Sequence, residues 1–361
     1  MSTKKVKKII VLTMMLSLSL CLMLTTSLQA GVVFETNFDN VQTWNPSGYA
    51  ACWQNSIPIE GGSGACGAPG GPLPLQGASS PSIFNDYRHL APQCSSIQTM
   101  HIGSASDIAT ATKVSSFTPY GGSGKSYVHF YEPCMSASGG WGSDGLLGVY
   151  FGKTTGYSEL YVQMKVRFQP GWQWQNGSQQ KLMHITHFNE DLNQGVLQAY
   201  EMFNYNLPDM VPGIYYNSTW YPRPQFYLHS SHTDKSTDSP SPTPNSIDIA
   251  DGNWHIIKFH VKLNSRANVA DGVKEMWLDG NSVVSYTNVP YTNANTPTAS
   301  AYGFNRVIFG GNTSNLFGSA DGRTQWYAVD DLVVSTTDIS TDYVIGGTGG
   351  APSAPKNLRL P

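Results

Sequence analysis

The sequence predicts an all-β protein folded as a sandwich of two antiparallel sheets. Along 254–263 apolar residues alternate with mostly polar ones, which is the pattern of a strand with one buried face. Many other short segments have strand character and are separated by clusters of Gly and Pro, whereas no amphipathic helix longer than about ten residues is visible. Short strands with such punctuation are typical of a two-sheet sandwich.

The expected strands are spread over most of the chain. The first lies within Val32–Asp39 and should pair near the last one. The others are expected at Ser126–Glu132, Gly145–Phe151, Ser158–Phe168, Lys181–Phe188, Val196–Asn204, Gln225–His229, Trp254–Leu263, Val273–Leu278, Arg306–Gly310 and Trp326–Ser335. Residues 44–123 and 233–245 lack this periodicity and are expected to form loops. A turn with positive φ at Gly280 is expected after Leu278.

The first thirty residues have the features of a secretory signal peptide. A basic stretch over 4–8 precedes an apolar run over Ile9–Leu24, and Ala30 offers a small residue for cleavage. A membrane anchor is the alternative interpretation, but the run is short for a spanning helix. We therefore expect a signal peptide at 1–30, one domain at 31–343 and a Gly/Pro-rich linker at 344–361. The protein should be secreted, to the extracellular space or the periplasm, without membrane association after cleavage.

Composition narrows the classes of partner. The formal net charge is −3 and charged residues make up 12% of the chain, so there is no basic surface to bind nucleic acid. Aromatic residues also make up 12%, mainly through Tyr and Trp, whose flat apolar faces and polar edges suit sugar rings. Packing in a β-protein accounts for the same residues. We expect a monomer that binds no nucleic acid.

Two segments resemble a known architecture. The strand Trp254–Leu263, with the turn that follows at Asp279-Gly280, is similar to the concanavalin A-like jelly rolls of secreted polysaccharide-active proteins. Trp326–Ser335 looks like the usual last strand of such folds. The resemblance implies a jelly-roll β-sandwich of two antiparallel sheets and a polysaccharide substrate.

A narrower resemblance concerns the segment from Ser158 to Leu182, which is similar to alginate and glucuronan lyase-like jelly rolls. That alginate lyase family has a Gly-Gly-Lys-Leu-Pro-Gly segment with a catalytic lysine. Lys181-Leu182 match it, whereas Gln179-Gln180 and Met183-His184 replace the glycines and the Pro-Gly pair. The family also has a Tyr-x-Tyr pair, which here reads Tyr227-Leu-His229.

The resemblance implies a polysaccharide lyase that cleaves a uronate-containing glycan by β-elimination. This reaction needs a base, an acid and a group that neutralises the uronate carboxylate, and Tyr, His and Lys can serve. We expect Tyr227 and His229 to transfer the protons and Lys181 to neutralise the carboxylate. A non-catalytic carbohydrate-binding domain and a glycoside hydrolase are the alternatives. A hydrolase needs two carboxyl groups, and neither Glu-x-Asp-x-x-Glu nor Glu-x-Asp-x-Glu occurs.

Further polar and aromatic residues on or beside the expected strands are candidate substrate contacts. They are His129, Tyr131, Trp172, Trp174, His184, Tyr200, Glu201 and Gln225. For His129 and Tyr131, a solvated outer face is the alternative. For Trp172 and Trp174, the alternative is closing the end of the sandwich.

Asp39 and Asp331 are candidate ligands for a structural Ca²⁺, which prefers oxygen ligands. In related sandwiches an Asp near the last strand joins oxygens of the first strand in holding such an ion. An ordinary charge pair at a strand edge is the alternative for Asp330-Asp331. No cofactor is expected for catalysis.

The cysteines lead to the first testable prediction. Apart from Cys21 in the signal, the chain has Cys52, Cys66, Cys94 and Cys134, and an even number in an exported chain favours two disulfides. Three pairings are possible, and closeness along the chain favours Cys52–Cys66 with Cys94–Cys134. Peptide mapping of the exported protein should find no free thiol. Alkylation of any of the four without prior reduction would contradict the prediction.

Overall fold

The computed structural model describes residues 31–39, 82–86, 112–131, 146–151, 156–187, 208–216, 218–219, 223–229, 248–292, 303–310, 313 and 325–346. Several predictions fall elsewhere in the chain. The expected signal peptide, the four cysteines, the expected strand Val196–Asn204, the loop 233–245 and most of the linker lie outside the described residues. These predictions stand as they were made.

The described residues form β-strands and one short 3₁₀ turn at Tyr120–Gly122. No helix among them is long and apolar enough to cross a membrane. The strands are β1 (Val32–Thr36), β2 (Ser82–Asp86), β3 (Thr112–Ser115), β4 (Ser126–Tyr131), β5 (Leu146–Tyr150), β6 (Glu159–Phe168), β7 (Ser178–Lys181), β8 (Met183–Thr186), β9 (Asp209–Tyr216), β10 (Gln225–His229), β11 (Trp254–Lys262), β12 (Gly272–Leu278), β13 (Asn281–Val289), β14 (Arg306–Gly310) and β15 (Gln325–Ser335).

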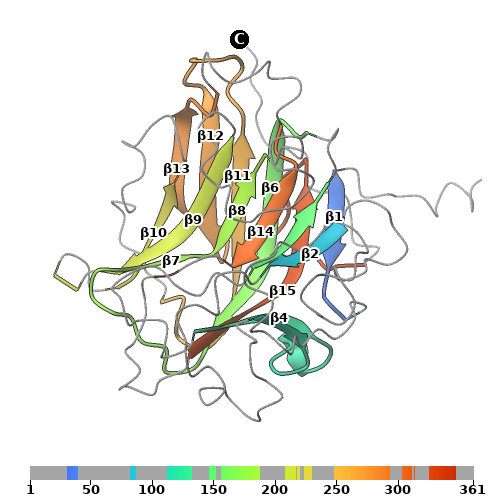
Figure 1. Ribbon diagram of the computed structural model, residues 1–361, viewed down its shortest axis with the longest axis vertical. Coiled ribbons are helices and arrows are strands. Elements are labelled where there is room, and N and C mark those ends of the chain that lie inside the picture. The colour runs from blue at the N-terminus through green and yellow to red at the C-terminus, as the bar shows by residue number, and fades with distance from the viewer. Residues whose placement is uncertain are drawn as a thin grey trace, which may run out of the picture.

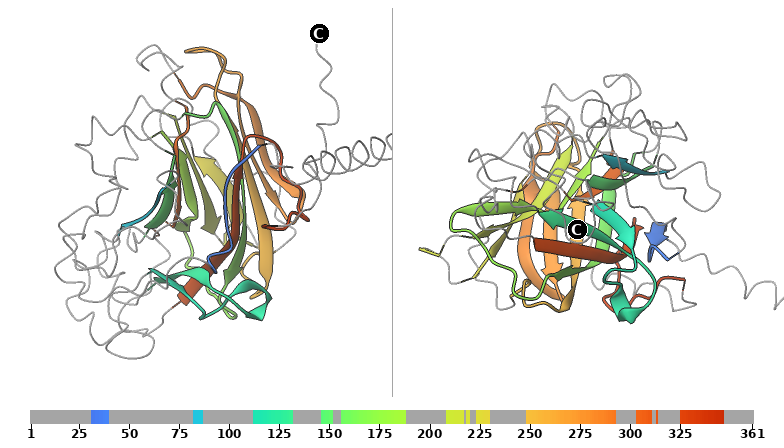
Figure 2. Two further views of the ribbon diagram at one scale, coloured as in Figure 1. Left: turned by 90° about the vertical axis from the view of Figure 1, so that its right-hand side faces the viewer. Right: turned by 60° about the horizontal axis from the view of Figure 1, so that its bottom comes forward.

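The strands make two antiparallel sheets that lie against each other as two layers (Figures 1 and 2). The eight-stranded sheet has the order β13-β12-β11-β6-β15-β4-β3, with β1 paired to β15. The seven-stranded sheet has the order β10-β9-β8-β14-β5-β2, with β7 paired to β9. This arrangement confirms the predicted jelly-roll sandwich. It also confirms that the first strand pairs with the last, because Glu35 lies opposite Val333.

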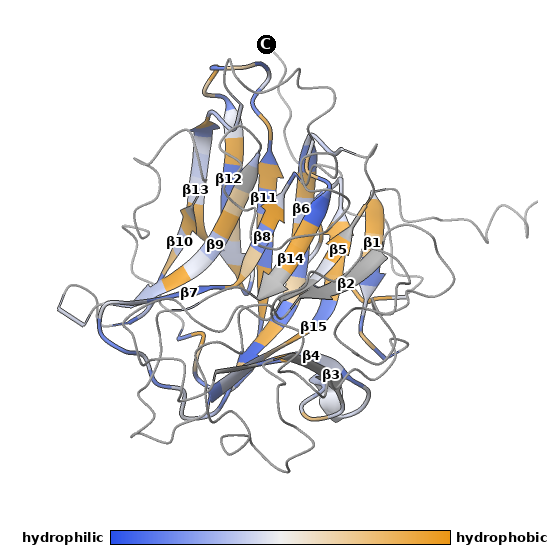
Figure 3. Cartoon of the chain, viewed as in Figure 1, coloured by the Kyte–Doolittle hydropathy of each residue, from blue (hydrophilic) through white to orange (hydrophobic). Residues whose placement is uncertain are grey.

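The hydrophobic core fills the space between the layers, and bands of apolar and polar residues on the strands reflect the alternation of side chains (Figure 3). From the eight-stranded sheet, β11 contributes Ile257, Phe259 and Val261, none of which is exposed. From the seven-stranded sheet, Ile214 and Phe226 are equally buried and belong to the same cluster. Burial of these apolar side chains is the main contribution to the stability of the folded chain.

Besides β7, which shares only Lys181 with an expected strand, four strands were not expected from the sequence. β2 and β3 lie within the region expected to be loops, and they form edges of the two sheets. β13 returns from the turn after β12, where Asp279 and Gly280 have φ of 49° and 79°. The expected positive φ at Gly280 is therefore confirmed. β9 was missed because Pro212-Gly213 at its centre has the appearance of a break.

Pro212 also explains why β7 and β8 are two strands. The carbonyl of Pro212 accepts a hydrogen bond from the Leu182 amide at 3.0 Å, so Pro212 faces this strand pair. In an antiparallel ladder the N–H of the same residue would point the same way, and Pro has none. The strand opposite bulges at this point, because Leu182 and Met183 are consecutive and both lie in the core.

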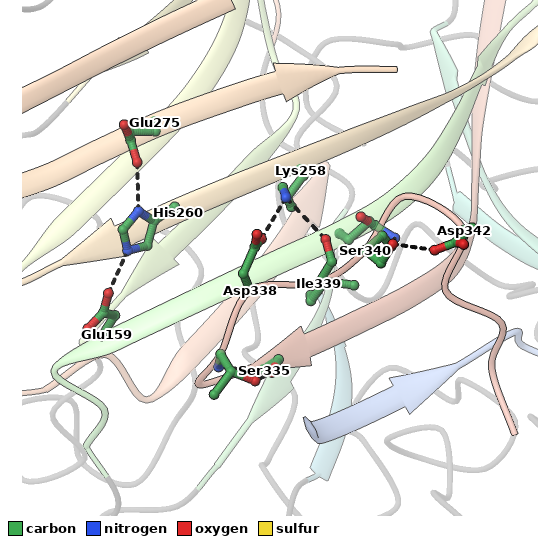
Figure 4. A network of polar contacts seen from close by, with 11 residues as sticks. Glu159, Lys258, His260, Glu275, Ser335, Asp338, Ile339, Ser340 and Asp342 are labelled. Carbon is green, nitrogen blue, oxygen red and sulfur yellow. Dashed lines mark hydrogen bonds and ion pairs between the residues drawn. The ribbon is translucent and has the colours of Figure 1, made fainter. Parts of the chain in front are cut away.

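A polar network covers part of the outer face of the eight-stranded sheet (Figure 4). His260 lies between two carboxylates, with Nε2 2.8 Å from Glu159 and Nδ1 2.8 Å from Glu275. Its ring stacks on Tyr161 with centroids 4.1 Å apart. Beside it, the Lys258 ammonium donates to Asp338 at 2.6 Å and so ties the segment after β15 to β11.

The network leads to a prediction about stability and pH. Burial disfavours protonation of His260, but hydrogen bonds to Glu159 and Glu275 outweigh it and raise its pKa. The hydrogen bond with His260 is the main cause that lowers the pKa of both glutamates. The His260 contribution is therefore complete below the unfolded pKa of about 6.5 and is lost as pH rises through the folded value. The glutamate contributions are present above their unfolded pKa of about 4.5 and are lost as pH falls through the folded values.

His260→Gln should consequently cost most stability between about pH 4.5 and 6.5 and progressively less above that range. Thermal unfolding of the two proteins from pH 4 to pH 9 measures the difference. Tm curves that stay parallel over the whole range would contradict the prediction.

Candidate active site

The side of the seven-stranded sheet turned away from the core is called here the far face. Gly213 of β9 pairs with Lys181 of β7 on one side and with Tyr227 of β10 on the other. Residues directly opposite each other in an antiparallel sheet lie on the same face. The next residues along β9 and β10, Ile214 and Phe226, belong to the core. Lys181 and Tyr227 therefore share the far face, on the two strands that flank Gly213.

The Tyr227 ring lies directly over Gly213. A Cβ built on Gly213 would be 2.3 Å from both Cζ and Oη of this tyrosine. The side chain therefore reaches over β9, in the direction of the strand of Lys181, instead of standing upright on the sheet. Tyr227 is 7% exposed, and Lys181 is half-buried.

His184 joins the far face because of the bulge at Leu182–Met183. Without a bulge, residues three apart such as Lys181 and His184 would lie on opposite faces. With one extra residue between them, His184 shares the face of Lys181, while Met183 and Ile185 on either side of it are in the core. His184 is completely buried.

His229 is placed by the backbone register. It pairs with Val211, two residues along β9 from Gly213. On the other side of β9, Ile185 pairs with Met210, so His184 lies level with Val211. Position 229 is thus two residues from Tyr227 along β10. It lies at the same level of the sheet as His184, with β9 between them. The sequence prediction that positions 225, 227 and 229 form one alternating set agrees with this register.

Gln225 is fully buried at the start of β10, opposite Tyr215. Its Nε2 donates to the carbonyls of Arg223 and Pro224 at 2.9 and 3.2 Å. Its Oε1 is buried, and no described residue donates a hydrogen bond to it. An acceptor held in this way, two residues from Tyr227, is suited to receive a hydroxyl donor.

Arg306 is the functional candidate that sequence reasoning missed. It is completely buried at the start of β14, and its neighbour Val307 is in the core, so Arg306 lies on the far face opposite Thr186. Its charge adds to burial in lowering the pKa of His187, against a hydrogen bond from His187 to the Gly303 carbonyl. The available signal was an arginine inside an expected apolar strand, since buried arginines need a special reason.

The structure differs from the expectation for His129. This residue lies on the core side of β4, completely buried. Its Nδ1 is 3.0 Å from the Tyr127 hydroxyl, and its ring stacks on Tyr327 at 5.2 Å. The strand face that carries His129 was expected to contact sugar or solvent. His129 instead bonds to Tyr127 and packs between the sheets. Tyr131 pairs with Gln325 at the end of the same strand.

Trp172 and Trp174 close one end of the sandwich. Both pack on Phe168, with ring centroids 4.8 and 5.7 Å apart, and on each other at 5.5 Å. Trp172 is 7% exposed and belongs to the core cluster. Of the two roles weighed from the sequence, the structural one agrees with the position of Trp172, while Trp174 is half-buried beside it.

The two aspartates expected to hold Ca²⁺ make contacts with other parts of the chain. Asp331 is the extra residue of a bulge between β15 and β6, with φ of 45°, and it ion-pairs with Lys165. Asp39 accepts the Lys125 amide at 2.8 Å. Among the described residues, no group of three or more acidic, His or Cys side chains is placed to hold a metal.

Asp330 is close enough to Asp39 for their charges to repel each other. Burial raises the pKa of Asp330 to about 7, and repulsion from Asp331 and Asp39 adds to the effect. The amides of Tyr120 and Asp331 oppose it by donating to the carboxylate. The other two candidate contacts, Tyr200 and Glu201, lie outside the described residues.

Comparison with known proteins gives a family match and several structural likenesses. The sequence pattern of the family described as polysaccharide lyase matches residues 141–328, which is more than half of the 361 residues. No curated protein sequence matches the chain. A variant of alginate lyase Aly36B in complex with an alginate trisaccharide is 15% identical, with a TM-score of 0.43 over 63% of this chain and 85% of that one.

Two further structures are similar over the same share of this chain. An alginate lyase from Aplysia kurodai is 13% identical, with a TM-score of 0.41 over 63% of this chain and 87% of the other. An endo-β-1,4-glucuronan lyase from the fungus Trichoderma reesei is 12% identical, with a TM-score of 0.37 over 63% and 87%. At such identities and TM-scores, the family rests on the sequence match, and the fold rests on the sheets themselves.

The location of His129 leads to a stability prediction. Because its ring fills core space between Tyr127 and Tyr327, His129→Ala should lower the free energy of unfolding by about 2–4 kcal/mol. Gln179→Ala is the matched control, since Gln179 is half-buried on β7 and should cost under about 1 kcal/mol. Urea unfolding of both variants measures the difference. Equal losses would show that His129 is not a core residue.

Proposed function

The chain belongs to the polysaccharide lyase family, and we propose that it cleaves a uronate-containing glycan by β-elimination on the far face of the seven-stranded sheet. The observation that carries this proposal is the row Lys181–Gly213–Tyr227. It brings a cation and a phenol together across one strand. A histidine position follows two residues after the phenol.

β-Elimination begins with removal of the proton next to the uronate carboxylate. The electron pair left on that carbon forms a double bond to the neighbouring carbon, and the glycosidic oxygen on that carbon leaves and takes up a proton. Negative charge accumulates on the carboxylate during the first step, so a nearby cation stabilises the transition state. Lys181 is proposed for that role, with Tyr227 and His229 as the groups that transfer protons.

Lys181 also affects what Tyr227 can do. An isolated tyrosine has a pKa of about 10 and is a weak base near neutrality, whereas a neighbouring cation favours the phenolate. The ring of Tyr227 lies over β9, between its own strand and that of Lys181, which is the position in which such an effect operates. Histidine, with an ordinary pKa of about 6.5, needs less assistance.

Arg306 is proposed as a second cation for the substrate. Its guanidinium can bind a carboxylate through two hydrogen bonds, and the interaction is stronger in a buried environment than in water. His184 is buried on the same face. Along the chain it lies between Lys181 and Thr186, and Thr186 is the residue opposite Arg306. A polyanionic glycan would therefore meet the opposite charges of Lys181 and Arg306.

The alternatives from the sequence remain testable. A hydrolase of the common kind needs two carboxyl groups about the scissile bond. The far-face side chains that the structure describes at the candidate positions are Lys181, His184, Gln225, Tyr227 and Arg306, and none is a carboxylate. We also propose that the protein acts after export, in keeping with the signal peptide and the paired cysteines expected from the sequence.

The direct test is to incubate the protein with alginate, glucuronan, pectin and glycosaminoglycans and to follow ultraviolet absorbance. An unsaturated uronate absorbs, so rising absorbance with at least one polymer is the expected result. New reducing ends without absorbance would identify a hydrolase instead. Binding without either product would identify a carbohydrate-binding domain.

Single variants test the assigned roles. Tyr227→Phe, His229→Ala and Lys181→Ala should each lower kcat by roughly a hundredfold or more, as expected for loss of a proton-transfer or charge-stabilising group. Tyr343→Phe is the matched control, because it removes a tyrosine hydroxyl that bonds to Glu35 on the other sheet. Steady-state kinetics and Tm are measured together. Full activity in Tyr227→Phe and His229→Ala would refute the assignment.

A further inference from the structure

We propose that Gly213 is a positioning residue of the active site, whose missing side chain allows Tyr227 to lie across β9 towards Lys181. The inference rests on the proposed lyase function and adds a residue to it. Gly213 contacts no substrate in this scheme. It acts by setting where the Tyr227 hydroxyl lies.

Steric contact is the first argument. The three atoms nearest to a Cβ at position 213 all belong to Tyr227, with Cζ and Oη at 2.3 Å and Cε1 at 2.6 Å. Real Cβ atoms do not approach other atoms so closely. An alanine at this position would therefore displace the phenol ring, and Gly213 is the residue that permits its present position.

The backbone supplies no other reason for glycine here. Glycine is often required where φ is positive, and Gly213 is not among the glycines with positive φ. Gly272, another strand glycine, differs because a Cβ there would meet the Val289 carbonyl oxygen at 2.4 Å and the Lys262 carbonyl oxygen at 2.8 Å. Gly272 is needed for the approach of strands, whereas the nearest atoms to a Cβ at Gly213 all belong to one side chain.

Glycine at the centre of a strand also has a cost. It loses more conformational freedom on folding than other residues and has no side chain to pack. β9 contains this glycine directly after Pro212, which leaves two successive residues of low strand propensity. With no requirement from the backbone, the location of Tyr227 is the gain that offsets this cost.

The chemical consequence concerns the distance between the phenol and the ammonium. Adjacent strands are about 4.8 Å apart, so Lys181 and Tyr227 start roughly 10 Å apart at their backbones. Because the Tyr227 side chain reaches over the middle strand, its hydroxyl lies about halfway to the strand of the lysine. Displacing the ring would separate the phenol from the cation that favours its ionised form.

A double-variant cycle tests the contact without any assay of activity. The variants are Gly213→Ala, Tyr227→Ala and both together. With Tyr227 present, Gly213→Ala should lower Tm by about 2–6 °C through overpacking. With Tyr227→Ala, the same change should leave Tm unchanged or raise it, because alanine is otherwise the better strand residue. Should Gly213→Ala alone fail to fold, recovery of folding in the double variant gives the same answer.

Kinetics then test the positioning role. Gly213→Ala should lower kcat about ten- to a hundredfold, as displacement of a reacting group by about 1 Å can do, with KM changed by less than about threefold. The limb of the pH–kcat profile that Tyr227 determines should move to higher pH, because the phenol loses its cation. A packing defect elsewhere would not move that limb.

The outcomes separate this inference from the proposed function. Equal Tm losses from Gly213→Ala in both backgrounds would overturn the contact, whatever the activity. Coupling in Tm with an unchanged kcat and pH profile would overturn the positioning role. Absence of lyase activity towards every glycan would refute the proposed function and with it the catalytic role of Gly213, while the Tm cycle would still report on the contact.

Discussion

The packing of one sheet on the other is the constraint on which the candidate site depends. Because side chains alternate along a strand, burying Ile214 and Phe226 against the eight-stranded sheet decides the direction of every other residue in β9 and β10. Tyr227 and Gln225 are thereby directed to the far face. The apolar core thus fixes where the polar groups are, and the chemistry follows from that placement.

The far face has an energetic character unlike that of an ordinary outer surface. Arg306, His184 and Gln225 are completely buried there, although they point away from the core. Buried polar groups reduce stability unless their bonding capacity is met, and buried charges do so strongly. On the outer face of the other sheet, His260 and Lys258 each have a carboxylate partner.

The fold could be predicted because its longest strands alternate clearly. β11 shows apolar residues at every second position, and β6 and β15 were also expected within a residue or so of their bounds. β9 could not be predicted, because Pro212-Gly213 outweighs the strand propensity around it. Alternation also does not tell which side of a strand is inward. His129 was therefore assigned to a polar face, whereas it bonds to Tyr127 inside the sandwich.

The site could be predicted only where it did not depend on irregular backbone. Tyr227 and His229 alternate in a regular strand, so their shared phase was visible in the sequence. Lys181 and His184 are three residues apart, and their common face results from a bulge that no residue pattern announces. The ion pair of Asp331 with Lys165 could not be predicted for the same reason, since it depends on a bulge in β15.

At the bulge of Leu182–Met183, opposite Pro212, the alternation of core and far-face side chains shifts by one residue. A strand of the same length that paired without a bulge would have β7 turned by half a rotation relative to β8, so that Lys181 entered the core and Gln180 took its place on the far face. The irregular pairing at this point is therefore as much a part of the site as the identity of its residues.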